Sequence, residues 1–178
     1  MKKCFYLSIS LLLFSFGKAQ NTNTSFAKNS ISNHYNKAQI LAFQNTSSEK
    51  FEQFADYFNL LQNTNDAELN AQIKQAIFSL FENPETEIQD FLGSNEKLPL
   101  REFLEKYQNS KQKLYIVSKK NEQQVFQNSW LNVYQIKTDS GKTIDLQQMI
   151  SFEINEKKFG SKTKEVWELK LGEISVKP

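Results

Sequence analysis

Few residues in this chain have the types and spacing that enzyme chemistry needs. The one histidine, His34, lies in a polar segment without the Asp, Cys or Ser constellation that would orient it as a catalytic base. The one cysteine, Cys4, cannot build a metal site together with a single histidine. The five glycines are dispersed and form no phosphate-binding loop. The sequence therefore predicts no catalytic residue, no metal ligand and no cofactor.

Carboxylate catalysis is the enzyme chemistry that remains open. Asp145, Glu153, Glu165 and Glu168 lie on segments with strand-like alternation. Asp145 and Glu153 alternate with an apolar row, and Glu168 alternates with Trp167, so these three side chains should face solvent. An isomerase or hydratase needs instead a buried carboxyl group whose pKa is raised. A binding role is therefore favoured, with such an enzyme as the alternative.

Aromatic side chains are better candidates for contact with a ligand. Tyrosine and tryptophan combine a large apolar body with a polar tip, which suits the wall of a pocket. The alternative is that they fill the core, because the chain contains 15 phenylalanines and builds its interior from aromatic rings. The candidates on predicted strands are Tyr115, Trp130, Tyr134, Phe152 and Trp167.

The first 19 residues have the three parts of a secretion signal. A basic start at residues 1–3 precedes an apolar run at residues 4–16 and the small-x-small pattern Gly17-Lys18-Ala19. The run is too short to span a bilayer, which needs about 20 apolar residues. We expect cleavage near Ala19 and an exported chain, periplasmic or secreted, without a membrane span or a cysteine.

The remaining chain suits one domain behind a polar leader. Residues 20–45 are rich in Asn, Ser and Thr and predict a flexible leader, in which Ile40, Leu41 and Phe43 could dock on a domain at residues 46–178. The chain has one arginine, Arg101, and no concentrated basic stretch. Nucleic-acid binders need a concentrated basic surface and favour arginine. The composition therefore excludes nucleic acid as a partner.

Three helices are predicted in the first half of the domain. Thr46 and Glu49 have capping-box spacing before an apolar stripe, and Asn65 and Glu68 repeat that spacing before a second stripe. Pro99 suits the first turn of a third helix that ends near residue 109. Residues 85–92 fit either a short strand or a helical turn, and the flanking turn residues favour the strand. The stripes are Phe51, Phe54, Phe58 and Leu61; Leu69, Ile73, Ala76, Ile77 and Leu80; and Leu100, Phe103, Leu104 and Tyr107.

The second half alternates with the period of strands. Residues 114–117 are apolar on both faces, which predicts an interior strand. A second strand over residues 125–138 ends at the turn signal of residues 139–142. An apolar row follows, interrupted by Gln148, where Gln147-Gln148 indicates a bend. The last strand changes parity at Gly172, which predicts a β-bulge. The apolar row consists of Ile144, Leu146, Ile150, Phe152 and Ile154.

The order of these elements resembles the NTF2-like, or cystatin-like α+β, superfamily. The resemblance runs from about Thr46 to the C-terminus: helices at 51–61 and 69–81, a strand pair at 85–97, a helix at 100–107 and a sheet over 114–176. It implies three helices packed on a strongly bent antiparallel sheet, which forms a cone with a pocket at its open end. It also implies a small apolar or amphipathic ligand, or a homodimer through the open sheet face. A structural protein of the cell envelope with a protein partner is the third hypothesis.

Overall fold

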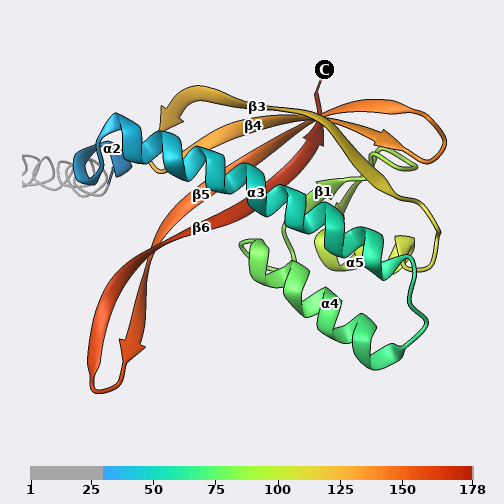
Figure 1. Ribbon diagram of the computed structural model, residues 1–178, viewed down its shortest axis with the longest axis horizontal. Coiled ribbons are helices and arrows are strands. Elements are labelled where there is room, and N and C mark those ends of the chain that lie inside the picture. Colours follow the sequence, from blue (N-terminus) through green and yellow to red (C-terminus); the bar gives the residue numbers. More distant parts are fainter. Residues whose placement is uncertain (1–29, 178) are drawn as a thin grey trace, which may run out of the picture.

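The computed structural model describes residues 30–177, which form an α+β domain. The elements follow the order of helix, helix, helix, two short strands, helix and four long strands (Figure 1). The proposed signal at residues 1–19 and the first ten residues of the predicted leader lie outside the described residues. Among residues 30–177, none of the helices has the length and apolar character needed to cross a bilayer.

The first long helix begins earlier than predicted. Helix α3 spans Lys37–Leu61, so the prediction that it begins at Thr46 was wrong. The actual cap is Asn36, whose side chain accepts from Gln39 N while Gln39 Oε1 accepts from Asn36 N. This is a capping box built from two amide side chains instead of Thr and Glu. Each side chain accepts from the backbone N–H of the other residue, so both N–H groups have a partner. The structured domain therefore includes part of the predicted leader.

The chain preceding α3 is also anchored. The short helix α2, Ile31–His34, buries Ile31 completely. The backbone N–H of Ile31 bonds to Asn128 Oδ1 at 2.8 Å and to Gln127 O at 3.3 Å, in the turn between the third and fourth strands. These bonds fix residues 30–36 against the sheet, so the described part of the predicted leader is ordered.

The other helices agree more closely with the sequence. Helix α4, Ala67–Leu80, is capped by Asp66, whose Oδ1 accepts from the N–H groups of Glu68 and Leu69. The predicted cap, Asn65, is one residue away. Helix α5, Leu100–Tyr107, follows Pro99 directly and buries Leu100, Phe103, Leu104 and Tyr107. One member of the second stripe, Leu69, is 46% exposed instead of buried.

The strands form one open sheet with the order β2-β1-β6-β5-β4-β3. All neighbouring pairs are antiparallel except β1 and β6, which run parallel with Ile88 opposite Ile174. The sheet is therefore mixed, where a wholly antiparallel sheet was expected. The strand bounds are β1 Glu87–Gln89, β2 Lys97–Pro99, β3 Leu114–Phe126, β4 Ser129–Thr138, β5 Thr143–Phe159 and β6 Lys162–Val176.

Strand β3 lies at an edge of the sheet, so the prediction of an interior strand was wrong. Its second apolar face is open, with Tyr115 47% and Val117 56% exposed. The side-chain amide of Asn59 on α3 bonds to both backbone groups of Leu114, accepting from its N–H at 2.8 Å and donating to its carbonyl at 2.9 Å. Beyond it, the pairing with β4 shifts register between Ile116 and Ser118, which places a bulge at Val117.

The core lies between α3 and the inner face of the sheet. Phe51, Phe54, Phe58 and Leu61 on α3 have no exposed surface, as their spacing predicted. The ring of Phe51 stacks on Tyr134 of β4, with centroids 3.8 Å apart and planes 7° apart. Close aromatic pairs contribute about 0.5–1.5 kcal/mol beyond the burial of their area. This contact sets α3 across the middle of the sheet (Figure 1).

The predicted bulge at Gly172 is confirmed. Gln148 pairs with Ile174 and Ile150 pairs with Leu171, so two residues of β6 oppose one residue of β5. The extra residue keeps both Leu171 and Ile174 on the buried face. A Cβ atom at Gly172 would lie 3.0 Å from the carbonyl oxygen of Met149 on the neighbouring strand. The bulge therefore disfavours a side chain at this position.

We expect Gly172→Ala to lower the free energy of unfolding by about 1–2 kcal/mol, because the opposing atom belongs to the backbone of a paired strand and cannot rotate away. Urea denaturation followed by circular dichroism would measure the change. Glu173→Ala, at the exposed neighbouring residue, is the matched control and should stay within about 0.5 kcal/mol of the wild type. Equal effects of the two substitutions would contradict the tight approach at Gly172.

Candidate ligand-binding site

Three of the five predicted aromatic residues lie together at one end of the sheet. Phe152 stacks on Trp167 with centroids 4.9 Å apart, and Trp130 lies 6.3 Å from Phe152. Phe43 of α3 adds a ring 4.7 Å from Phe152. Trp130 is fully buried whereas Trp167 is half-buried. The rings thus form a row from the core to the surface, which we call the aromatic row.

The other two predicted residues lie elsewhere. Tyr134 is fully buried against Phe51 and contacts the polar groups described next. Tyr115 does not belong to the candidate site, because it points away from the core on the edge strand β3. Its hydroxyl donates to Asp139 at 3.0 Å on the outer face. The sequence predicted an interior strand because Tyr115 and Val117 make the second face of this segment apolar. Because β3 lies at the edge of the sheet, that face is open to solvent instead.

A set of polar side chains lies inside the core beside the aromatic row. Asn132 Nδ2 donates to Ser47 Oγ at 2.7 Å and to Tyr134 OH at 2.9 Å, and Trp130 Nε1 donates to the same Ser47 Oγ at 3.2 Å. Ser47 Oγ in turn donates to the carbonyl of Gln44 at 2.6 Å. Gln148 of β5 lies directly opposite Asn132 of β4. We call Ser47, Asn132, Tyr134 and Gln148 the interior polar cluster.

This cluster leaves several buried polar atoms without a hydrogen-bond partner among the described residues. They are Asn132 Oδ1 and both amide atoms, Oε1 and Nε2, of Gln148. Both side chains have no exposed surface. A buried polar atom that lacks a partner costs about 1–3 kcal/mol, so folded proteins seldom keep one without a reason. Three such atoms on facing positions of two strands mark a site with unused hydrogen-bonding capacity.

Burial also affects the hydroxyl group in this cluster. The burial of Tyr134 raises the pKa of its phenol well above the usual value. The phenol therefore stays protonated over the physiological range and keeps a proton that it can donate. The cluster presents neutral groups only, namely hydroxyls and amides. Such groups suit the recognition of a neutral polar head group and supply no general base.

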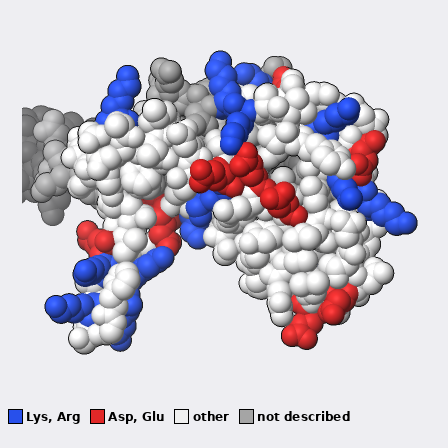
Figure 2. Space-filling view, in the orientation of Figure 1, with Lys and Arg blue, Asp and Glu red and all other residues white. Residues whose placement is uncertain are grey.

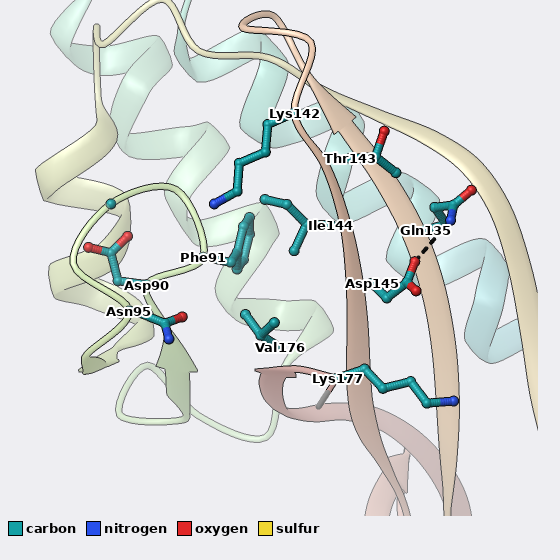
Figure 3. A pocket seen from close by; sticks show the side chains of 11 residues that line it. Asp90, Phe91, Asn95, Gln135, Lys142, Thr143, Ile144, Asp145, Val176 and Lys177 are labelled. Atoms are coloured by element: carbon teal, nitrogen blue, oxygen red, sulfur yellow. Dashed lines mark hydrogen bonds between the residues drawn. The ribbon is translucent and has the colours of Figure 1, made fainter.

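A second candidate is an open hollow of about 630 Å³ at the far end of the sheet (Figure 3). Phe91, Ile144 and Val176 point toward one another at its centre, and the amine of Lys142 is directed over them. Asp145 at its side accepts from Gln135 Nε2 at 3.0 Å. The apolar floor of this hollow is narrow, and the charged groups of the hollow lie at its rim. The hollow therefore lacks polar groups that converge on one point, as those of the interior polar cluster do.

Asp90 beside this hollow is committed to structure. Its carboxylate, whose side chain has no exposed surface, accepts from Lys106 Nζ at 2.6 Å, from Tyr107 OH at 2.5 Å and from both N–H and Oγ of Ser94 at 3.0 Å. Burial alone would raise the pKa of Asp90, but these hydrogen bonds outweigh it and lower the pKa to about 2. Asp90 therefore fixes the loop between β1 and β2 onto α5.

Of the carboxylates considered for catalysis, Asp145 and Glu153 face solvent as predicted, whereas Glu168 was also predicted to face solvent and is partly covered. Asp145, Glu153 and Glu165 are exposed. Glu168 is half-buried, and its pKa is lowered by hydrogen bonding to Lys157, with Asn155 adding a bond at 2.9 Å. Among residues 30–120 and 125–177, whose side chains the structure describes, no three His, Cys, Asp or Glu side chains are grouped so that they could hold a metal ion.

Sequence reasoning overlooked the interior polar cluster, although part of its signal was present. Gln148 interrupts the apolar row of β5 at an inward position, and pattern reading attributed it to a bend. The inner row in fact continues through it, and the irregular pairing lies just beyond, between Gln148 and Ile150. Ser47 gave no signal at all, because its partner Asn132 is 85 residues away in the chain.

The buried ionic hydrogen bonds of Asp90 predict a pH dependence of stability. Because the folded pKa, about 2, lies below the unfolded value of about 3.9, the contribution is complete above about pH 5 and is lost as the pH falls towards 2. We expect Asp90→Asn to lower the free energy of unfolding by about 2 kcal/mol at pH 7 and by much less at pH 2.5. Urea melts across this range would measure both differences.

The exposed Glu96 offers the control, since Glu96→Gln should change stability little at either pH. A difference between Asp90→Asn and the wild type that stays constant from pH 7 to pH 2.5 would contradict the role of the carboxylate charge.

The chain matches no protein-family model and no curated protein sequence. The interior polar cluster is the part of the described domain that most lacks hydrogen-bond partners. In this cluster, buried amides of β4 and β5 face one another beside the aromatic row.

Proposed function

We propose that this protein is an exported, NTF2-like binding domain whose interior holds a small molecule with an apolar body and a neutral hydrogen-bonding head group. The observation that carries the proposal is the set of three unpaired amide atoms on Asn132 and Gln148. The order of the elements and the bulge that bends β6 support the family assignment. The homodimer through the open sheet face stays a separate proposal.

The chemistry of the interior matches such a ligand at both ends. The amide groups of Gln148 and Asn132 offer one donor-acceptor pair and one further acceptor, which suit an alcohol, a ketone or an amide. The aromatic row from Trp130 to Trp167 would accommodate the apolar body. Trp167 is half-buried at the surface end of this row and packs against His34 and Tyr35, so entry of a ligand there would require these two rings to move.

The same groups support the non-catalytic role that we propose. The cluster contains no carboxylate, and the tyrosine keeps its proton because its pKa is raised. The isomerase or hydratase alternative needs a carboxyl group with a raised pKa. Asp90 and Glu168, the described acids whose pKa values are clearly shifted, both have lowered pKa values. Neither acid could therefore hold a proton at neutral pH for such a reaction.

The substitution Gln148→Leu separates a binding site from an ordinary core. It removes two unpaired polar atoms while keeping similar volume, so the free protein should become more stable by about 1–3 kcal/mol. It should also abolish binding of small cyclic alcohols, ketones and amides, measured by native mass spectrometry and by the combined fluorescence of Trp130 and Trp167. A gain in stability joined to a loss of binding is expected of a site maintained for function.

The neighbouring Gln147→Leu is the matched control, because Gln147 lies on the opposite face of β5 and is half-buried. Its ligand binding should equal that of the wild type. The proposed function is wrong if the wild type binds none of these compounds and purifies without a bound mass. It is equally wrong if Gln148→Leu binds them as the wild type does.

A further inference from the structure

The hairpin of β5 and β6 extends well beyond the body of the domain (Figure 1). Every residue from 156 to 165 is exposed, whereas the same two strands are buried on one face farther along. We call residues 156–165 the arm. Gly160, with φ of +63°, begins the two-residue turn between the paired Phe159 and Lys162. Glycine at this first position is typical of a tight hairpin turn.

The end of the arm carries positive charge only. Residues 157–164 contain four lysines and no acid. Figure 2 shows these lysines at the tip and the acidic residues where the arm leaves the body. Glu156 and Glu165 are directly opposite each other, one pair closer to the body than Lys157 and Lys164. The arm is therefore polarised along its length.

Three of the four lysines share one face with an exposed aromatic ring. Lys157 pairs with Lys164 and Phe159 pairs with Lys162, and positions two apart on a strand point to the same side. Phe159 is 55% exposed, and Lys164 Nζ lies 5.9 Å from the centre of its ring. We call Lys157, Phe159, Lys162 and Lys164 the tip face. Glu156 and Glu165 point to the opposite side.

This arrangement is unfavourable in the isolated protein. Like charges directly opposite on paired strands destabilise the pair, and a phenyl ring at a turn gains nothing from exposure to water. Only Lys157 of the tip face forms an ion pair among the described residues, with Glu168. A partner that supplies negative charge and an apolar layer together would relieve both costs.

We propose that the tip face docks on the surface of an anionic phospholipid bilayer. Lysines flanking an aromatic side chain are suited to this interface, because the ammonium groups meet the phosphates while the ring enters the boundary of the acyl chains. The arm projects far enough to reach a flat surface ahead of the body (Figure 1). This inference does not depend on the proposed ligand site.

A second copy of the chain is the competing occupant. Helix α3 carries Glu49, Glu52 and Asp56 at helical spacing, which could face the lysines of another molecule (Figure 2). Glu52, however, already pairs with Lys119 of β3 at 2.7 Å. Glu49 and Asp56 are exposed, so this face meets Phe159 with charged side chains. The observations therefore favour the bilayer.

The test compares full-length protein with the triple variant K157Q/K162Q/K164Q in sedimentation with vesicles. Vesicles of 70% phosphatidylcholine and 30% phosphatidylglycerol should bind the wild type, and pure phosphatidylcholine vesicles much less. Each lysine near an anionic surface contributes about fivefold, so the triple variant should bind about 100-fold more weakly. Phe159→Ser should weaken binding in the presence of 0.5 M salt, where the charges are screened.

The control is K120Q/K137Q/K142Q, which removes the same charge from exposed positions outside the arm. It should bind the mixed vesicles within about threefold of the wild type. Circular dichroism and thermal melting would verify that both variants fold. The proposal is overturned if the tip variant binds the mixed vesicles as the wild type does. It is overturned as well if the two triple variants lose the same amount of vesicle binding. It is also overturned if the tip variant only abolishes self-association of the protein, without any loss of lipid binding.

Discussion

The contact on which this domain depends is the face-to-face packing of α3 on β4, centred on the stacked rings of Phe51 and Tyr134. It places Ser47, one turn before Phe51, against Asn132 and Trp130. The same register sets Asn59, two turns after Phe51, against Leu114 at the sheet edge. One helix thus makes the apolar contact, the contact with the polar interior and the contact with the sheet edge, because a rigid helix fixes the relative positions of the residues along it.

The sequence predicted those features that depend on local periodicity. The spacing of neighbouring residues predicted the helical stripes, the inward row of β5 and the bulge at Gly172. The start of α3 was missed because Asn36 and Gln39 form an uncommon version of a familiar cap. The edge position of β3 was missed because an apolar outer face looks the same at an edge and in the interior. The interior polar cluster was missed because its members meet only after folding.

The domain separates its two proposed roles in space. Strand β5 runs from the open hollow at Thr143, past Gln148 in the core, to Phe159 at the end of the arm. Its inner half is held by the helices, so the geometry of the amides is fixed. Its outer half is stabilised by backbone pairing with β6, together with the ion pair of Lys157 and Glu168 and the hydrogen bond of Asn155 and Glu168. Rigidity therefore decreases along β5, from the interior polar cluster to the tip face. The interior polar cluster needs its amides in fixed positions, whereas the tip face needs exposed charge.

The amide of Asn59 has a consequence for how these molecules behave in a crowded solution. By occupying both backbone groups of Leu114, it imitates one residue of an additional strand and closes the start of the β3 edge. The bulge at Val117 and the charges of Lys119 and Lys120 interrupt the edge beyond that point. Over residues 114–120 a second molecule therefore meets no regular ladder of donors and acceptors, which disfavours growth of the sheet at this part of the β3 edge.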